Sequence, residues 1–137
     1  MRHAILNTLL LAACTLAGSA TAADCLRYDY REVSFKGTLV LKTPETTLTP
    51  HAKHRNPTEK HAFLVLDKPI CTTAGSNTYE SGETNQSELT LYTEQSTGLA
   101  QYAGKAVTVS GVLIHAFVAD AHTPLMVAVK RVAVLAK

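Results

Sequence analysis

Apolar residues alternate with polar ones over much of the chain, which is the pattern of strands buried on one face. In the first such stretch the residues in phase are Val33, Phe35, Gly37, Leu39 and Leu41. A glycine in phase with the apolar positions permits a bend or a bulge. The pattern therefore predicts one long, bent strand at the start of the domain.

The same criterion predicts four more strands further along the chain. They are expected at 61–66, around 89–91, at 107–117 and at 125–129. The triplet Asp67 to Pro69 is expected to end the second strand, because proline donates no ladder hydrogen bond. Turn residues from Asp120 to Pro124 separate the last two strands and predict a hairpin.

One short helix is predicted between the third and fourth strands, over Glu94 to Ala103, with Gly104 placed to end it. Five strands with a helix at this position favour a small OB-like barrel, in which Gly37 and Gly111 would allow tight coiling. An immunoglobulin-like β-sandwich is the alternative, but it ordinarily has about seven strands.

The first 23 residues have the organisation of a secretory signal peptide. Arg2 precedes an apolar run over Ala4 to Leu16, and Ala20 to Ala22 has the small-residue spacing that signal peptidase cleaves. We therefore expect a signal peptide over 1–23, a single disulfide-stabilised domain over 24–137, and a periplasmic or secreted bacterial product. The alternative is an outer-membrane lipoprotein, because Leu11 to Cys14 also matches a lipobox.

The length and the charge of the chain exclude several classes of protein. About 114 residues after the leader suit one domain. Twelve Lys and Arg residues then face eleven Asp and Glu residues, so the chain lacks the basic field of a nucleic-acid binder. The apolar run over 107–119 is broken by Ser110, Gly111 and His115, and no membrane span is expected after the leader.

Two cysteines remain after the leader, Cys25 and Cys71. An even number of cysteines in a small exported domain predicts a disulfide, here closing a loop of about 45 residues. Neither cysteine has a CxxC partner or an adjacent base, so a structural bond is preferred to a redox role. The bond is expected to tie the start of the mature chain to the end of the second strand.

Three segments carry a resemblance to a known family. They are Leu64 to Cys71 (LVLDKPIC), Gly104 to Leu113 (GKAVTVSGVL) and His122 to Leu125 (HTPL). Together they resemble the bacterial domain-of-unknown-function family four-four-three-one over about a third of the mature chain. The resemblance implies an exported small β-protein with a histidine-rich turn before the last strand, a turn in which this chain has His122.

Catalytic motifs are missing from the sequence. It contains no nucleophile elbow, phosphate-binding glycine loop or two-histidine zinc helix. Ser110 and His115 lie five positions apart on one predicted strand and should point to opposite faces. We therefore expect a protein that is not an enzyme and uses no cofactor. Metal binding by His115 and His122, near the last hairpin, is an alternative function.

The charged loops favour a binding function. The basic residues of the loop before the second strand are expected to contact a partner, and they are Lys53, His54, Arg55 and Lys60. Four glutamates between Glu80 and Glu94 form an acidic counterpart. The prediction is an exported domain that recognises a periplasmic or envelope protein, as an inhibitor or immunity protein. An accessory subunit of an envelope complex is a further alternative.

Overall fold

The computed structural model describes residues 24–43, 59–94, 98–116 and 121–136. In this part of the chain the elements follow in a simple order. They are β1 (Glu32–Lys42), β2 (His61–Ile70), β3 (Gln86–Tyr92), the 3-10 helix η3 (Ala100–Tyr102), β4 (Ala106–His115) and β5 (Leu125–Val134). The prediction of a mainly β protein is confirmed.

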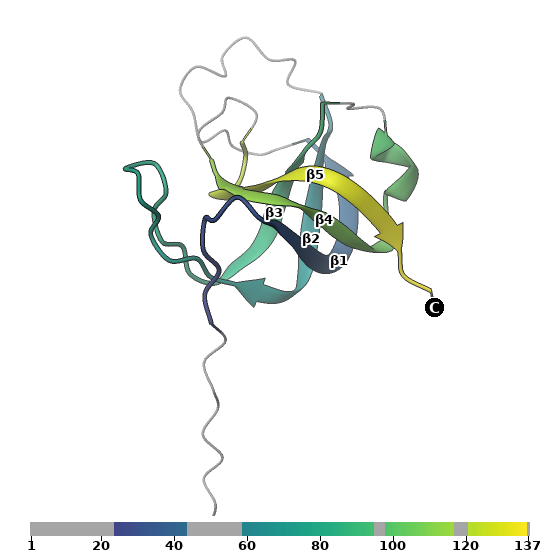
Figure 1. The fold of residues 1–137 in the computed structure, drawn as a ribbon. Coiled ribbons are helices and arrows are strands. Elements are labelled where there is room, and N and C mark those ends of the chain that lie inside the picture. The colour runs from purple at the N-terminus through teal and green to yellow at the C-terminus, as the bar shows by residue number, and fades with distance from the viewer. Residues whose placement is uncertain (1–23, 44–58, 95–97, 117–120, 137) are drawn as a thin grey trace, which may run out of the picture.

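The five strands close into a barrel in the order β1-β2-β3-β5-β4 (Figure 1). The long strand β1 pairs with β4 through its first part and with β2 through its second part, and Gly37 and Thr38 pair on both sides. Strands β3 and β5 are parallel, whereas the other pairs are antiparallel. This closed barrel confirms the predicted five-stranded OB-like fold and excludes the β-sandwich.

Two glycines allow neighbouring strands to approach closely. A Cβ atom added at Gly37 would lie 2.1 Å from the carbonyl oxygen of Val65. One added at Gly111 would lie 2.2 Å from the carbonyl oxygen of Ala128, next to a register shift between β4 and β5. Both glycines are therefore required by close backbone contacts, as expected for tightly coiled strands.

The alternating apolar positions form the core, as predicted. Phe35, Leu39, Val109 and Leu113 are buried inside the barrel, together with the corresponding residues of β3 and β5. Val33 and Leu41, at the ends of β1, are only partly buried against this core. Position 117, assigned to the fourth strand, lies outside the described residues.

Three predicted elements have wrong bounds. Strand β5 runs to Val134, well past the expected end at position 129. Strand β2 continues past Asp67 to Ile70, although Pro69 lies within it. Proline is tolerated there because the pairing of β2 with β3 is interrupted between Val65 and Ile70, so its missing N–H costs no regular ladder bond. The helix predicted over 94–103 is only the single turn of η3 in the described part of that segment.

The disulfide joins Cys25 to Cys71, as predicted. Cys71 follows the last residue of β2, and next to the bond Leu26 forms a parallel bridge with Thr72. Backbone hydrogen bonds run from Leu26 N to Cys71 O at 2.8 Å and from Thr73 N to Leu26 O at 2.9 Å. The bond and the bridge fix the N-terminal segment to the start of the β2–β3 connection.

Residues 1–23 lie outside the described part, so the signal peptide and the lipobox at Cys14 stay predictions. The described residues include no helix of the length and hydrophobicity that a bilayer span requires. The disulfide itself is consistent with an oxidising, exported compartment.

Candidate functional site

A hollow of about 420 Å³ lies where three segments of the chain meet. Tyr30 comes from the segment before β1, Ile114 and His115 end β4, and the remaining residues belong to the β2–β3 connection. That connection extends away from the body of the barrel (Figure 1). The lining residues are Tyr30, Asn77, Tyr79, Glu80, Ile114 and His115, which we call the Tyr30 pocket.

Tyr30 has an unusual backbone conformation. Its φ angle is 57°, in the left-handed region that bulky side chains rarely adopt. The residue is 64% exposed, yet its hydroxyl donates a hydrogen bond of 2.5 Å to Oε1 of Glu80. That hydrogen bond, followed by the charge of the carboxylate, raises the pKa of Tyr30 above its ordinary value. Strained residues of this kind concentrate at functional sites.

Glu80 is a buried acid, only 7% exposed. Its second carboxylate oxygen, Oε2, has no hydrogen-bond partner among the described residues. The oxygen packs over Gly75, where an added Cβ atom would lie 1.9 Å away. The loop closes around the acid through hydrogen bonds from Gly75 N to Glu80 O and from Glu80 N to Asn77 O. The fold thus holds a carboxylate with unused acceptor capacity beside the pocket.

Tyr79 is the second exposed aromatic residue of the pocket, at 72% exposure. Its backbone N–H donates to the side-chain oxygen of Asn77 at 2.9 Å, an Asx-type turn that sets the local backbone. Tyr30, Tyr79 and Ile114 supply aromatic and aliphatic surface, whereas Glu80 supplies charge.

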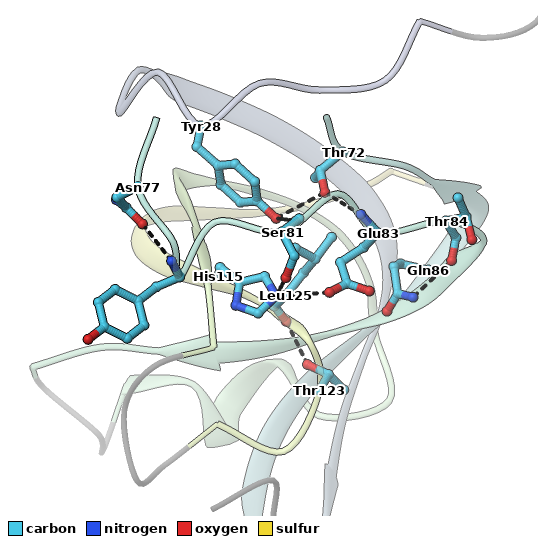
Figure 2. Close-up of polar contacts among 11 residues, drawn as sticks. Tyr28, Thr72, Asn77, Ser81, Glu83, Thr84, Gln86, His115, Thr123 and Leu125 are labelled. Atoms are coloured by element: carbon cyan, nitrogen blue, oxygen red, sulfur yellow. Dashed lines mark hydrogen bonds and ion pairs between the residues drawn. The ribbon is translucent and has the colours of Figure 1, made fainter. Parts of the chain in front are cut away.

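His115 contacts two residues of the β2–β3 connection through one ring nitrogen. Its Nε2 lies 2.9 Å from Glu83 Oε1 and 3.1 Å from Ser81 Oγ (Figure 2). Nε2 must carry a proton to bond the carboxylate, and a protonated nitrogen cannot accept the proton of a serine. In a catalytic triad the acid and the serine occupy opposite nitrogens. The Ser81, Glu83 and His115 trio therefore does not have triad geometry.

Tyr28 anchors the same connection from the N-terminal segment. Its hydroxyl donates to the carbonyl oxygen of Ser81 at 2.8 Å and lies 2.9 Å from Thr72 Oγ1, which in turn accepts from Glu83 N at 3.0 Å (Figure 2). Burial is the main cause that raises the pKa of Tyr28, and the charges of Glu83 and Glu80 add to it. The network fastens both ends of 72–83 next to the disulfide.

The predicted metal residues lie in different surroundings. His115 contacts Glu83, Ser81 and the ring of Tyr28, whereas the ring of His122 lies 4.4 Å from that of His61 and 6.0 Å from that of Phe63. Across the described ranges, no three or more His, Cys, Asp or Glu residues group as a metal site. Metal binding by His115 and His122 stays a prediction.

The predicted partner-binding residues are only partly within the described chain. Lys53, His54 and Arg55 lie outside it. Lys60 is exposed just before β2 and lines a separate hollow with Leu41, Tyr92 and others. Ser110, which lies five positions from His115 in the sequence, hydrogen-bonds to Ser34 at 2.8 Å rather than to His115.

Sequence reasoning missed Tyr30, Tyr79 and the role of Glu80. The available signal was the presence of tyrosines in otherwise polar connecting segments, at 28–30 and at 77–81. Exposed aromatic residues in loops are candidates for binding. Only the fold, however, brings the two segments together.

No family model, curated protein or solved structure matches this chain. The resemblance to the domain-of-unknown-function family four-four-three-one therefore stays a prediction.

Proposed function

We propose that this protein is an exported, non-enzymatic binding domain that recognises a protein partner through the Tyr30 pocket. The observation that carries the proposal is Tyr30 itself. A mostly exposed tyrosine with a left-handed backbone is anchored through its hydroxyl to a buried acid. Core packing does not explain a strained tyrosine that is mostly exposed, whereas strained residues cluster at functional sites and tyrosine is enriched at the energetic centres of interfaces.

Rigidity of the pocket supports a role in recognition. The disulfide, the Leu26–Thr72 bridge and the Tyr28 network fix the segments that carry Tyr30 and Tyr79. A surface that is ordered before binding loses less conformational entropy when the partner arrives. Tyrosine is also among the residues enriched at the energetic centres of protein interfaces.

The compartment narrows the partner class. The disulfide and the predicted leader support a periplasmic or secreted protein, with a lipid anchor at Cys14 as the alternative. We propose a periplasmic or envelope protein as the partner, with this chain acting as its inhibitor or immunity protein. An accessory subunit of an envelope complex would use the same surface. Lys53, His54, Arg55 and Lys60 remain a second predicted contact.

The proposal is tested by crosslinking the native protein in its own envelope and then reconstituting binding with the purified partner. Tyr30→Ala and Tyr79→Ala should weaken binding by at least about tenfold, as expected for central aromatic contacts. Val65→Ala is the matched control, because Val65 is an exposed apolar residue on β2 that lines neither the Tyr30 pocket nor the hollow beside Lys60. A reconstituted partner that binds the two pocket variants as tightly as the unaltered protein would refute this function.

A further inference from the structure

We infer that the Tyr30 pocket receives an arginine side chain of the partner. The inference rests on the proposed function and adds the chemistry of the group that is recognised. It combines a carboxylate with unused acceptor capacity, two exposed tyrosine rings and a hollow of about 420 Å³.

The charge of the pocket favours a cation. Among the ion pairs of the described residues, the basic side chains contact other acids: Arg31 pairs with Asp29, Lys42 with Glu88 and Arg131 with Glu32. Glu80 has no basic partner there, and its Oε1 is occupied by the hydroxyl of Tyr30. A positively charged group in the pocket would lie next to this carboxylate and offset its charge, whose burial with Oε2 unpartnered is otherwise costly.

The walls of the pocket favour arginine over lysine. Tyr30 and Tyr79 are exposed aromatic residues at the rim, and a guanidinium plane stacks on aromatic rings as well as bonding carboxylates. Ile114 offers apolar surface to the methylene stem of a long basic side chain. The hollow lies near the lower end of the range for ligand pockets, about 300 to 1,000 Å³, which suits one side chain.

The test is a titration of the full oxidised protein with N-acetyl-arginine amide in the presence of EDTA. Binding is measured from the amide chemical shifts of the protein in NMR spectra. We expect saturable shifts at Gly75, Asn77, Tyr79 and Glu80. N-acetyl-citrulline amide, a neutral analogue of the same shape, should bind at least about tenfold more weakly, because it lacks the charge. Equal binding of the two probes, or shifts that do not saturate, would overturn the inference.

Single substitutions test whether the arginine probe binds in the Tyr30 pocket. Glu80→Gln should weaken arginine binding at least about tenfold, whereas Glu88→Gln, at an acid on β3 outside the pocket, should leave it unchanged. Tyr79→Ala serves as a second pocket variant that leaves the Tyr30–Glu80 hydrogen bond in place, in case Glu80→Gln does not fold. Undiminished binding to Tyr79→Ala and to folded Glu80→Gln contradicts the inference, as does tighter binding of N-acetyl-lysine amide.

The outcomes separate this inference from the proposed function. If the arginine probe does not bind while Tyr30→Ala still weakens binding of the partner, the Tyr30 pocket is the partner-binding surface but it does not recognise arginine. If the probe binds through Glu80 but the tyrosine variants leave the partner unaffected, the pocket recognises arginine and the proposed function is wrong.

Discussion

The hydroxyl of Tyr30 donates a hydrogen bond to Glu80, a residue fifty positions further along the chain. The bond joins the segment before β1 to the β2–β3 connection, and the disulfide ties the segment before β1 to the start of the same connection. Tyr30 has a left-handed backbone, a conformation that costs free energy and persists only where the surrounding structure imposes it. The Tyr30–Glu80 hydrogen bond therefore both holds the β2–β3 connection and shapes the Tyr30 pocket.

Alkaline pH should destabilise the fold through Tyr28 and Tyr30. Both pKa values are raised in the folded protein, Tyr28 chiefly by burial and Tyr30 chiefly by its hydrogen bond to Glu80. A raised pKa means that the stabilising contribution is complete below the unfolded value of about 10 and is lost as pH rises through the folded value. Urea unfolding at increasing pH should therefore show a falling free energy of unfolding above about pH 10.

The control for this prediction is the Tyr28→Phe, Tyr30→Phe double variant. Its free energy of unfolding should depend less steeply on pH in the same range, because the two hydroxyls are gone. An unchanged pH slope in the double variant would show that other groups cause the effect.

Loss of the disulfide should destabilise the protein by roughly 2–4 kcal/mol, because the bond restrains a long loop in the unfolded chain. The two cysteines are separated by 46 positions. Urea unfolding of Cys25→Ser, Cys71→Ser measures the change. Reductant should bring the unaltered protein to the stability of the variant and leave the variant unaffected. Equal stability of the oxidised and reduced protein would contradict the prediction.

Gly75→Ala should destabilise the protein by about 1–3 kcal/mol, because the new methyl group would overlap the carboxylate of Glu80. Thermal or urea unfolding measures the loss. Gly98→Ala is the matched control, since an added Cβ there meets no atom within 4 Å. Glu80→Gly should relieve the overlap, because it removes the carboxylate and also the Glu80 Cβ atom, which the new methyl group would meet at 2.6 Å, so that Gly75→Ala costs much less in that background. An equal loss of stability from Gly75→Ala in the two backgrounds would show that overlap with the Glu80 side chain is not its cause.

Leu39→Ala should reduce the free energy of unfolding by about 2–5 kcal/mol, the range for a leucine removed from a packed core. Leu39 is fully buried in the barrel, whereas Val134 at the end of β5 is half exposed. Val134→Ala should therefore change stability far less. Denaturant unfolding of the two variants gives the comparison, and a similar loss in both would mean that the barrel interior does not dominate stability.

Much of the fold was predictable because it depends on local patterns. Alternation located the apolar faces of β1, β4 and β5, and the glycines at positions 37 and 111 marked where strands approach closely. The end of β2 was misplaced because the effect of Pro69 depends on whether β3 pairs regularly beside it. That is a property of the neighbouring strand rather than of the segment itself.

The candidate site was largely beyond prediction. Tyr30 and Glu80 each lie in a polar segment, where an exposed tyrosine or a surface acid is ordinary. Their contact requires the barrel to bring positions fifty residues apart together. The contacts of His115 could not be predicted either, because they depend on Ser81 and Glu83 both lying within hydrogen-bond distance of one ring nitrogen.

By itself, the sequence determined the strands, the barrel class and the pairing of Cys25 with Cys71, since periodicity and cysteine number are read along the chain. Tertiary structure alone decided that Tyr30 adopts a left-handed backbone, that Glu80 is buried and that the two meet at a pocket. The physical reason is that strand patterns express local preferences, whereas burial and long-range hydrogen bonds depend on closure of the barrel.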